Sequence, residues 1–252
     1  MKIAVITGAS SGLGAEFAFA VNENPKNIEE IWLIARRADK LSELSQKLKI
    51  KTKILPLDIT DYEGLKAYKD ALIEEKADVS LLINNAGYGK LGDFYELSPE
   101  DNAGMIRLNC EALTYFTSIT LPFMKENSEI INSCSIASFA PNTRMAVYSS
   151  TKAYVMSFSR ALREELKLKK INVLAACPGP MDTEFLPLAG IGKGCSKTFD
   201  TLPRVNPKTM AEKSLKASRA KKAVYTNRIF YKFYRILAKI LPHSIVMKMA
   251  GT

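Results

Sequence analysis

The sequence predicts an α/β fold, a single domain built on a doubly wound parallel sheet. Short apolar runs rich in β-branched residues alternate with helix-length segments over the first 180 residues. Polarity does not alternate within these runs, which is typical of strands covered on both faces. A glycine-rich turn joins the first apolar run to the first helix-length segment. This βαβα order favours a parallel sheet with helices on both sides.

The expected elements follow one another in a regular order. Strands are expected at residues 3–7, 31–35, 53–57, 81–84, 130–134 and 173–177, and helices at 13–22, 39–49, 62–76, 103–126 and 147–168. In such a sheet, ligands bind beyond the C-terminal ends of the strands. The residues that directly follow the strands are therefore the candidates for a functional site.

Length and composition narrow the class of protein. The 252 residues, of which 47% are apolar, suit one domain with a sizeable core. The apolar runs are too short for a membrane-spanning helix or a secretory signal. The four cysteines form no CxxC pair and the chain has one histidine. We therefore expect free thiols, a cytoplasmic location and no metal site.

The turn after the first strand is suited to holding a pyrophosphate. Gly8 allows a sharp turn, Gly12 allows the backbone to approach a phosphate, and Gly14 lets the following helix pack closely on the strand. The helix N-terminus adds unpaired N–H donors and the positive end of a dipole. We expect a Rossmann-type dinucleotide site formed by the turn residues Gly8, Ser10, Ser11, Gly12, Leu13 and Gly14.

The end of the second strand favours NADPH over NADH. An NAD site usually carries Asp or Glu there to hold the ribose hydroxyls, but this chain has Ala35 followed by Arg36 and Arg37. No carboxylate at that place repels a 2′-phosphate, and a guanidinium can pair with it. The other interpretation is that both arginines are simply solvated in a loop.

Tyr148, Lys152 and Ser135 form a candidate catalytic group. Tyr148 and Lys152 are four residues apart and so share one face of an expected helix. Acid–base work near neutral pH requires a lowered tyrosine pKa, which a close ammonium can supply. Ser135 follows the fifth strand, and its hydroxyl can donate to a carbonyl oxygen on which charge develops. Ser133 competes for this role, but strand alternation favours Ser135.

Taken together, these motifs resemble the short-chain dehydrogenase/reductase family, in its NADP(H)-preferring members of roughly 250 residues. The Gly-x-x-x-Gly-x-Gly turn and the 13-residue interval between Ser135 and Tyr148 carry the resemblance, which covers about residues 2–185. It implies that Lys152 also binds the nicotinamide ribose and that Asn109 holds a water near Lys152. It further implies cofactor contacts from Asp58, Asn85, Ala86, Gly87, Pro178, Gly179 and Thr183, the last to the carboxamide. From the residues alone, Asp58 is equally a turn or helix-capping residue.

The expected function follows from these residues and this resemblance. We expect an NADP(H)-dependent oxidoreductase that interconverts a hydrophobic ketone or aldehyde and an alcohol, with Ser135, Tyr148, Lys152 and Asn109 as its site. The alternative from another class is a catalytically silent, NADP(H)-binding regulatory or scaffold protein that acts through its basic tail. A homo-oligomer, dimer or tetramer, is expected, and nucleic-acid binding is not.

Charge divides the chain at residue 203. Residues 1–203 have a net charge of −1 and residues 204–252 one of +11. We expect a catalytic domain over 1–203, with a substrate loop at 184–203, and a basic helical extension over 204–252 packed on it. Within the extension, residues 228–241 pattern as an amphipathic basic helix too short to span a bilayer. Three placements remain open for it: on an anionic membrane surface, against a second subunit, or over its own active site.

Overall fold

The computed structural model describes residues 1–192 and 194–249. Over these residues seven strands form one parallel sheet in the order β3-β2-β1-β4-β5-β6-β7. The strands are β1 (Lys2–Thr7), β2 (Glu30–Ile34), β3 (Lys51–Leu55), β4 (Asp78–Asn84), β5 (Glu129–Ser133), β6 (Asn172–Ala176) and β7 (Val224–Tyr225). The strand order reverses between β1 and β4, so the predicted doubly wound α/β sheet is confirmed.

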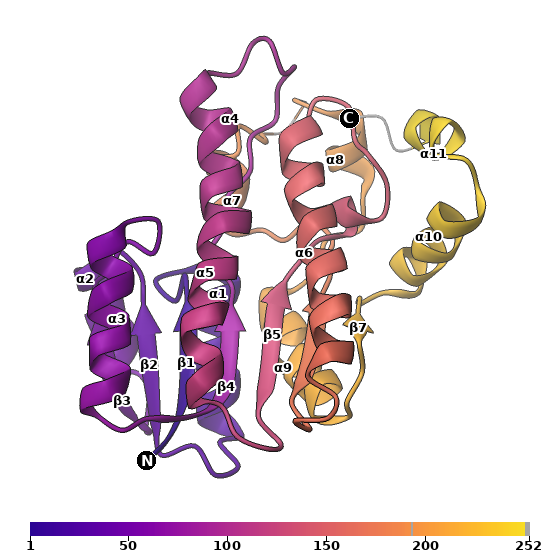
Figure 1. Cartoon of the computed structure of the whole chain (residues 1–252). Helices are drawn as coiled ribbons and strands as arrows, with labels where there is room; N and C mark the ends of the chain where they lie inside the picture. The colour runs from indigo at the N-terminus through magenta and orange to yellow at the C-terminus, as the bar shows by residue number, and fades with distance from the viewer. Residues whose placement is uncertain (193, 250–252) are drawn as a thin grey trace.

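Helices cover both faces of this sheet (Figure 1). One face is packed by α1 (Gly12–Glu23), α2 (Ala38–Ser45) and α9 (Pro207–Arg219), and the other by α3 (Tyr62–Glu74), α5 (Leu113–Thr120) and α6 (Ala146–Glu165). The short helices α4 (Pro99–Ile106), α7 (Phe185–Leu188) and α8 (Lys197–Thr201) lie near the C-terminal ends of the strands, where ligands bind in such folds.

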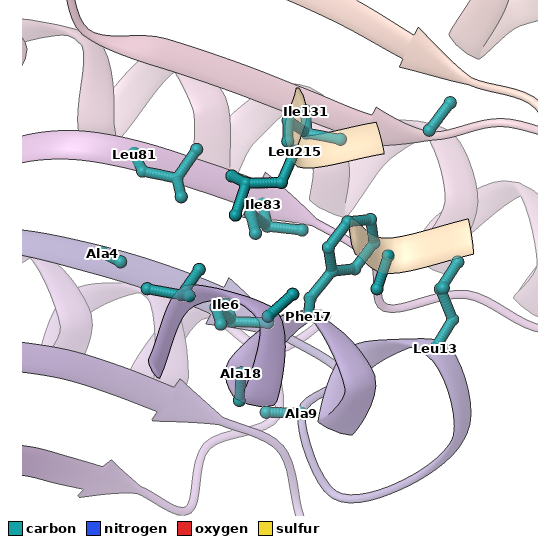
Figure 2. Packing of buried hydrophobic residues seen from close by; sticks show 14 of the residues in the cluster. Ala4, Ile6, Ala9, Leu13, Phe17, Ala18, Leu81, Ile83, Ile131 and Leu215 are labelled. Atoms are coloured by element: carbon teal, nitrogen blue, oxygen red, sulfur yellow. The ribbon is translucent and has the colours of Figure 1, made fainter. Parts of the chain in front are cut away.

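Alternating strand residues build the two halves of the core. Figure 2 shows the first half, in which Phe17 and Leu13 of α1 and Leu215 of α9 pack over Ile6 and Ile83 of the central strands. The second half surrounds Trp32 and a stacked pair of rings, Tyr68 and Phe116. These side chains are large and almost fully buried, so they supply much of the apolar burial that stabilises the fold.

Several predicted boundaries are wrong for identifiable reasons. β3 ends at Leu55 and not at residue 57, because Pro56 has no N–H to donate to a neighbouring strand. The helix expected at 103–126 begins at Pro99, where the Ser98 side chain accepts the Asp101 N–H as an N-cap. β7 was not predicted, since two residues are too short to show a pattern.

The long helix between β4 and β5 contains a π-helical segment, η1 (Arg107–Ala112), between α4 and α5. A short 3-10 turn, η2 (Leu121–Phe123), ends it, and another, η3 (Ile136–Ser138), follows β5. π segments often occur at functional positions because they displace side chains from the regular helical register. Asn109, a predicted site residue, lies in the middle of η1.

The basic extension contributes to two different parts of the molecule. Its first helix, α9, packs against α1 and the sheet. Helices α10 (Ile229–Ile240) and α11 (His243–Met249) instead lie at the edge of the domain, beyond β7 (Figure 1). In the predicted loop and extension, residue 193 and residues 250–252 lie outside the described residues. No helix within the described part of the chain is long and apolar enough to cross a bilayer.

Candidate active site

The glycine turn between β1 and α1 has the backbone that a phosphate cradle requires. Gly8 and Gly12 have φ angles of 66° and 53°, which disfavour any residue with a side chain. A Cβ on Gly14 would lie 2.1 Å from the Gly8 carbonyl oxygen, so the close packing expected of this glycine is present. The Ser11 N-cap makes no side-chain capping bond, which leaves the first N–H groups of α1 available to an anion. The turn therefore fits the pyrophosphate of a dinucleotide.

The two arginines after β2 have different surroundings. Arg36 is exposed and lies 3.7 Å from the Asp58 carboxylate. Arg37 donates to the hydroxyls of Ser10 and Ser11 on the glycine turn, at 3.0 and 2.9 Å. Arg37 also forms a 2.8 Å ion pair with Glu184, whose pKa is lowered mainly by this hydrogen bond. A pair of residues 147 positions apart thus joins the phosphate turn to the substrate loop.

Asp58 forms a turn at the C-terminal end of β3. Its carboxylate accepts the Thr60 N–H and hydroxyl, at 2.9 and 2.7 Å. Burial raises the pKa of Asp58, but these two hydrogen bonds and the Arg36 charge outweigh burial and lower it overall. The N-cap of α3 is Asp61, so the capping role considered for Asp58 is wrong. Asp58 is therefore a turn residue, with one carboxylate oxygen on Thr60 and the other facing Arg36.

The segment after β4 is bound tightly to β1. The amides of Asn85 and Ala86 both donate to the Thr7 hydroxyl, at 3.0 and 3.1 Å. The Asn85 side chain donates to the Gly8 carbonyl and accepts the Ser133 hydroxyl. A Cβ on Gly87 would lie 2.8 Å from the Asn109 Oδ1, so this glycine allows the segment to pass close to the candidate catalytic residues.

Ser135, Tyr148 and Lys152 are brought together at the ends of β5 and α6. All three are at most 8% exposed. The Ser135 side chain lies close enough to the Tyr148 hydroxyl to influence its pKa. The Lys152 Nζ lies 5.7 Å from the centre of the Tyr148 ring and donates to the Ser133 carbonyl at 2.8 Å. Ser133 therefore contributes a backbone acceptor, a role that sequence reasoning missed, while its hydroxyl is directed to Asn85.

Burial dominates the electrostatics of this group. It raises the pKa of Tyr148 well above the ordinary value of 10.0, although the nearby Ser135 side chain opposes the shift. Burial also lowers the pKa of Lys152. In the chain by itself the Lys152 ammonium donates to the Ser133 carbonyl, and burial is the largest influence on the pKa of Tyr148. Tyr148 in this state is a protonated phenol, which is the form that donates a proton.

Asn109 lies in η1, is almost completely buried, and connects two neighbouring segments through its side-chain hydrogen bonds. Its Oδ1 accepts the Tyr88 N–H at 3.0 Å, and its Nδ2 donates to the Tyr88 carbonyl and the Thr151 hydroxyl. Two of the bonds attach η1 to the segment after β4, and the third attaches η1 to α6. This arrangement places Asn109 next to Gly87 and, through Gly87, near the Lys152 Nζ. Nothing in the sequence identified Tyr88 and Thr151 as partners of Asn109, although Tyr88 follows Gly87 and Thr151 precedes Lys152.

The loop after β6 closes over Tyr148. Pro178 and Gly179 are buried, and the Pro178 carbonyl accepts the Ile136 N–H at 3.0 Å, so they lie beside Ser135. The Thr183 side chain lies 3.3 Å from a Cβ built on Gly12, next to the glycine turn. The Phe185 ring lies 5.7 Å from the Tyr148 ring.

Apolar side chains of α7 and the residues after it surround Tyr148. Leu186 and Ile191 are buried in one cluster with Tyr148, Met105 and Met145, whereas Leu188 is exposed. Leu188 therefore lies outside this cluster. Apolar side chains thus pack around Tyr148, whose hydroxyl and that of Ser135 are polar groups suited to a carbonyl oxygen.

The sheet and the site define the class of protein. Three features are typical of a pyridine-nucleotide oxidoreductase. They are the glycine turn where the strand order reverses, the two basic residues after β2, and the buried Ser-Tyr-Lys group near the strand ends. In agreement, the sequence model of the short chain dehydrogenase family matches residues 2–199. The chain belongs to this family and is an oxidoreductase that acts on hydroxyl or carbonyl groups.

Individual relatives agree with this membership. The chain is 34% identical over 191 residues to an NADP-dependent 3-hydroxy acid dehydrogenase of Schizosaccharomyces pombe, covering 73% of each chain. It is 35% identical over 184 residues to a very-long-chain 3-oxoacyl-CoA reductase of Emericella nidulans, covering 68% of this chain and 51% of the relative. A short-chain dehydrogenase from Sphingobium yanoikuyae, solved with NADPH, is 27% identical with a TM-score of 0.78, covering 95% and 94% of the two chains.

Proposed function

We propose that this chain is an NADPH-dependent reductase of hydrophobic ketones or aldehydes, with Tyr148 as the proton donor. The proposal rests on the side chains of Ser135 and Tyr148, which are buried close to each other and beside the Lys152 ammonium. The apolar cluster around Tyr148 supports a hydrophobic substrate. The two relatives, an NADP-dependent 3-hydroxy acid dehydrogenase and a very-long-chain 3-oxoacyl-CoA reductase, support the reaction class.

Each residue of the group has a separate task. Bound NADPH would supply the hydride for the carbonyl carbon. The Ser135 hydroxyl donates to the carbonyl oxygen and stabilises the charge that develops there. The Tyr148 phenol gives its proton to the same oxygen. The Lys152 ammonium stabilises the resulting phenolate, and Asn109 fixes the positions of the Tyr88 segment and α6 around it.

The Tyr148→Phe variant tests the chemistry. Loss of the proton donor should lower turnover by about 10²- to 10⁴-fold, while NADPH binding is retained. Initial rates of NADPH oxidation with a panel of ketones, aldehydes and diketones measure this. Tyr154→Phe is the matched control, since Tyr154 lies on the same helix but is 41% exposed and bonds only the Thr114 hydroxyl among described contacts. Undiminished turnover of Tyr148→Phe would remove Tyr148 from the mechanism.

The same assay separates the reductase from a silent binding protein. If the chain binds NADPH but oxidises it with no member of the panel, the scaffold alternative is favoured.

Two arginine variants test the choice of cofactor. Arg36→Ala and Arg37→Ala should each weaken NADPH binding by about tenfold or more, because each variant loses charge-assisted hydrogen bonds to the 2′-phosphate. NADH lacks this phosphate, so NADH binding should stay nearly unchanged. Dissociation constants from fluorescence titration report this, and an unchanged NADPH preference in both variants would contradict it.

We also propose that the protein forms a homo-oligomer through α5 and α6. Exposed aromatic side chains lie on both helices, Tyr115 on α5 and Tyr154 on α6, where Tyr154 stacks on Phe158. Aromatic residues are enriched in protein interfaces. Light scattering of the wild type and of Tyr115→Lys would test this, with a smaller particle expected for the variant. A cytoplasmic location remains a prediction.

A further inference from the structure

Helix α10 carries large apolar side chains on its exposed side, where a helix at the surface of a domain normally has polar residues. Its large apolar side chains at Ile229, Phe230, Phe233, Ile236 and Ile240, here called the apolar stripe, are between 52% and 84% exposed. At about 100° per residue, Ile229, Phe233, Ile236 and Ile240 fall within about 60° of one another. Exposed apolar side chains scattered singly are ordinary, but a contiguous stripe marks a contact surface.

The inner side of the same helix is already occupied by its own domain. Tyr231 is fully buried, donates its hydroxyl to the Pro203 carbonyl at 2.7 Å, and packs on Gly179. Tyr234 lies against the Phe139 ring at 5.9 Å. These inner residues lie roughly opposite the apolar stripe around the helix. The stripe therefore faces away from the chain, as the place of α10 at the edge of the domain suggests (Figure 1).

Cations flank the stripe without acidic partners. Lys232 and Lys239 are exposed along one side of α10, and Arg235 is half-buried beside them on the inner side. None of the three forms an ion pair in the part of the chain that the structure describes. Residues 213–252 contain ten Lys and Arg and no Asp or Glu. The ligand that covers this surface must be apolar in its centre and negatively charged at its border.

We propose that α10 docks the protein on an anionic lipid bilayer, with the apolar stripe in the interface and Lys232 and Lys239 among lipid phosphates. A helix of 12 residues is about 18 Å long and lies in the plane of the interface instead of crossing it. A second copy of this chain fits less well, because its α10 would bring further cations and the 213–252 segment offers no carboxylates. This inference goes beyond the proposed chemistry and does not depend on it.

The inner side of α10, opposite the docking surface, contacts residues next to the candidate active site. Tyr231 packs on Gly179 in the loop after β6, and Phe139, which contacts Tyr234, is four residues beyond Ser135. A bilayer on the outer side of α10 would therefore be separated from these residues by the width of one helix. If the proposed reductase function also holds, a hydrophobic carbonyl compound dissolved in the lipid could reach the site without crossing much water.

Co-sedimentation of the full chain with vesicles tests the docking directly. Wild-type protein should bind vesicles of phosphatidylglycerol and phosphatidylcholine, and lose binding on pure phosphatidylcholine or at high salt. The double variant Phe233→Ser/Ile236→Ser should bind at least tenfold more weakly. Lys232→Gln/Lys239→Gln should bind about 20- to 30-fold more weakly, since each basic residue near an anionic surface is worth about fivefold.

Controls keep the outcomes distinct. Leu168→Ser removes an apolar residue that is 93% exposed but lies outside α10, and it should bind vesicles as the wild type does. Circular dichroism and NADPH titration check that each variant is folded. Wild-type protein that fails to bind anionic vesicles overturns the proposal. If a wild-type oligomer then dissociates in Phe233→Ser/Ile236→Ser, a second copy is the occupant; if both remain the same size, an acidic protein partner is favoured.

Discussion

The candidate active site and helix α10 depart from ordinary protein architecture in opposite directions. At the site polar groups are buried, with Lys152 and Asn109 at 6% and 1% exposure, whereas on α10 the apolar stripe is exposed. Charged residues are usually exposed and contiguous apolar ones covered. The buried polar groups are compensated by hydrogen bonds inside the chain, but the stripe has no such compensation. The first region is therefore organised for chemistry, and the second for a contact outside the chain.

The largest expected effect separates the two sides of α10. Tyr231→Ala should destabilise the fold by about 3–5 kcal/mol, because a fully buried aromatic ring and its hydrogen bond to Pro203 are lost. Phe233→Ala on the same helix should change stability by less than about 0.5 kcal/mol, since its ring is 59% exposed. Urea unfolding measures both. Equal losses for the two variants would show that the stripe is covered within the protein.

A second prediction concerns the buried polar side of the comparison. Ser135→Ala should lower kcat by about 10²- to 10³-fold, because one donor to the developing oxyanion is removed, with a smaller effect on KM. The exposed Ser150, between Tyr148 and Lys152 in sequence, provides the control variant Ser150→Ala. Steady-state kinetics with the best substrate of the carbonyl panel decide the matter. A change confined to KM would make Ser135 a binding residue only.

Alkaline pH tests how strongly burial controls titrating groups. Burial raises the pKa of Tyr68 above its ordinary value of 10.0. The contribution of Tyr68 to stability is therefore complete below about pH 10 and is lost as the pH rises further, by about 1.4 kcal/mol per pH unit, because the unfolded phenol ionises first. Urea unfolding at pH 9, 10 and 11 should show a shallower decline for Tyr68→Phe than for the wild type. Parallel declines would mean that Tyr68 ionises equally in both states.

The smallest expected effect concerns the exposed Arg37–Glu184 pair at the border of the site. Glu184→Gln should raise NADPH affinity by up to about fivefold, because Arg37 loses a competing carboxylate and an exposed ion pair is worth at most about 1 kcal/mol. NADH affinity should stay the same. Glu43→Gln, which removes an exposed carboxylate paired with Lys40, is the control. Weaker NADPH binding in Glu184→Gln would indicate that the pair holds the site in its binding geometry.

The sequence was informative wherever function or backbone geometry restricts residue type. Gly14 must be glycine because any Cβ would meet the Gly8 carbonyl, and such a restriction is visible as a motif. The apolar strands are likewise visible because the sheet is covered on both faces. The boundary error at Pro56 was avoidable, since proline cannot pair within a sheet. The Ser98 N-cap was also present in the sequence as a serine before proline and two acidic residues.

Other features depend on tertiary structure and have no local signal. The pair of Arg37 and Glu184 joins residues far apart in sequence. β7 exists because the free edge of β6 offers partners, with the Cys177 N–H donating to the Tyr225 carbonyl at 2.7 Å. The direction of the Tyr148 pKa shift depends on burial by residues from several segments of the chain, which the spacing to Lys152 could not reveal. The outward direction of the α10 stripe was undecidable from its periodicity, which fits burial equally well.

The π segment η1 adds one residue to the helix between β4 and β5. Relative to a continuous α-helix, a π turn accommodates one additional residue, so η1 is equivalent to a single insertion in the helix that carries Asn109. Deleting one residue between 107 and 112 would let the helix close regularly, but it would rotate the residues on one side by about 100° relative to the other. Either Asn109 would leave Tyr88 and Thr151, or Phe116 would leave the stacked pair with Tyr68. The insertion allows one helix to serve the site and the core at the same time.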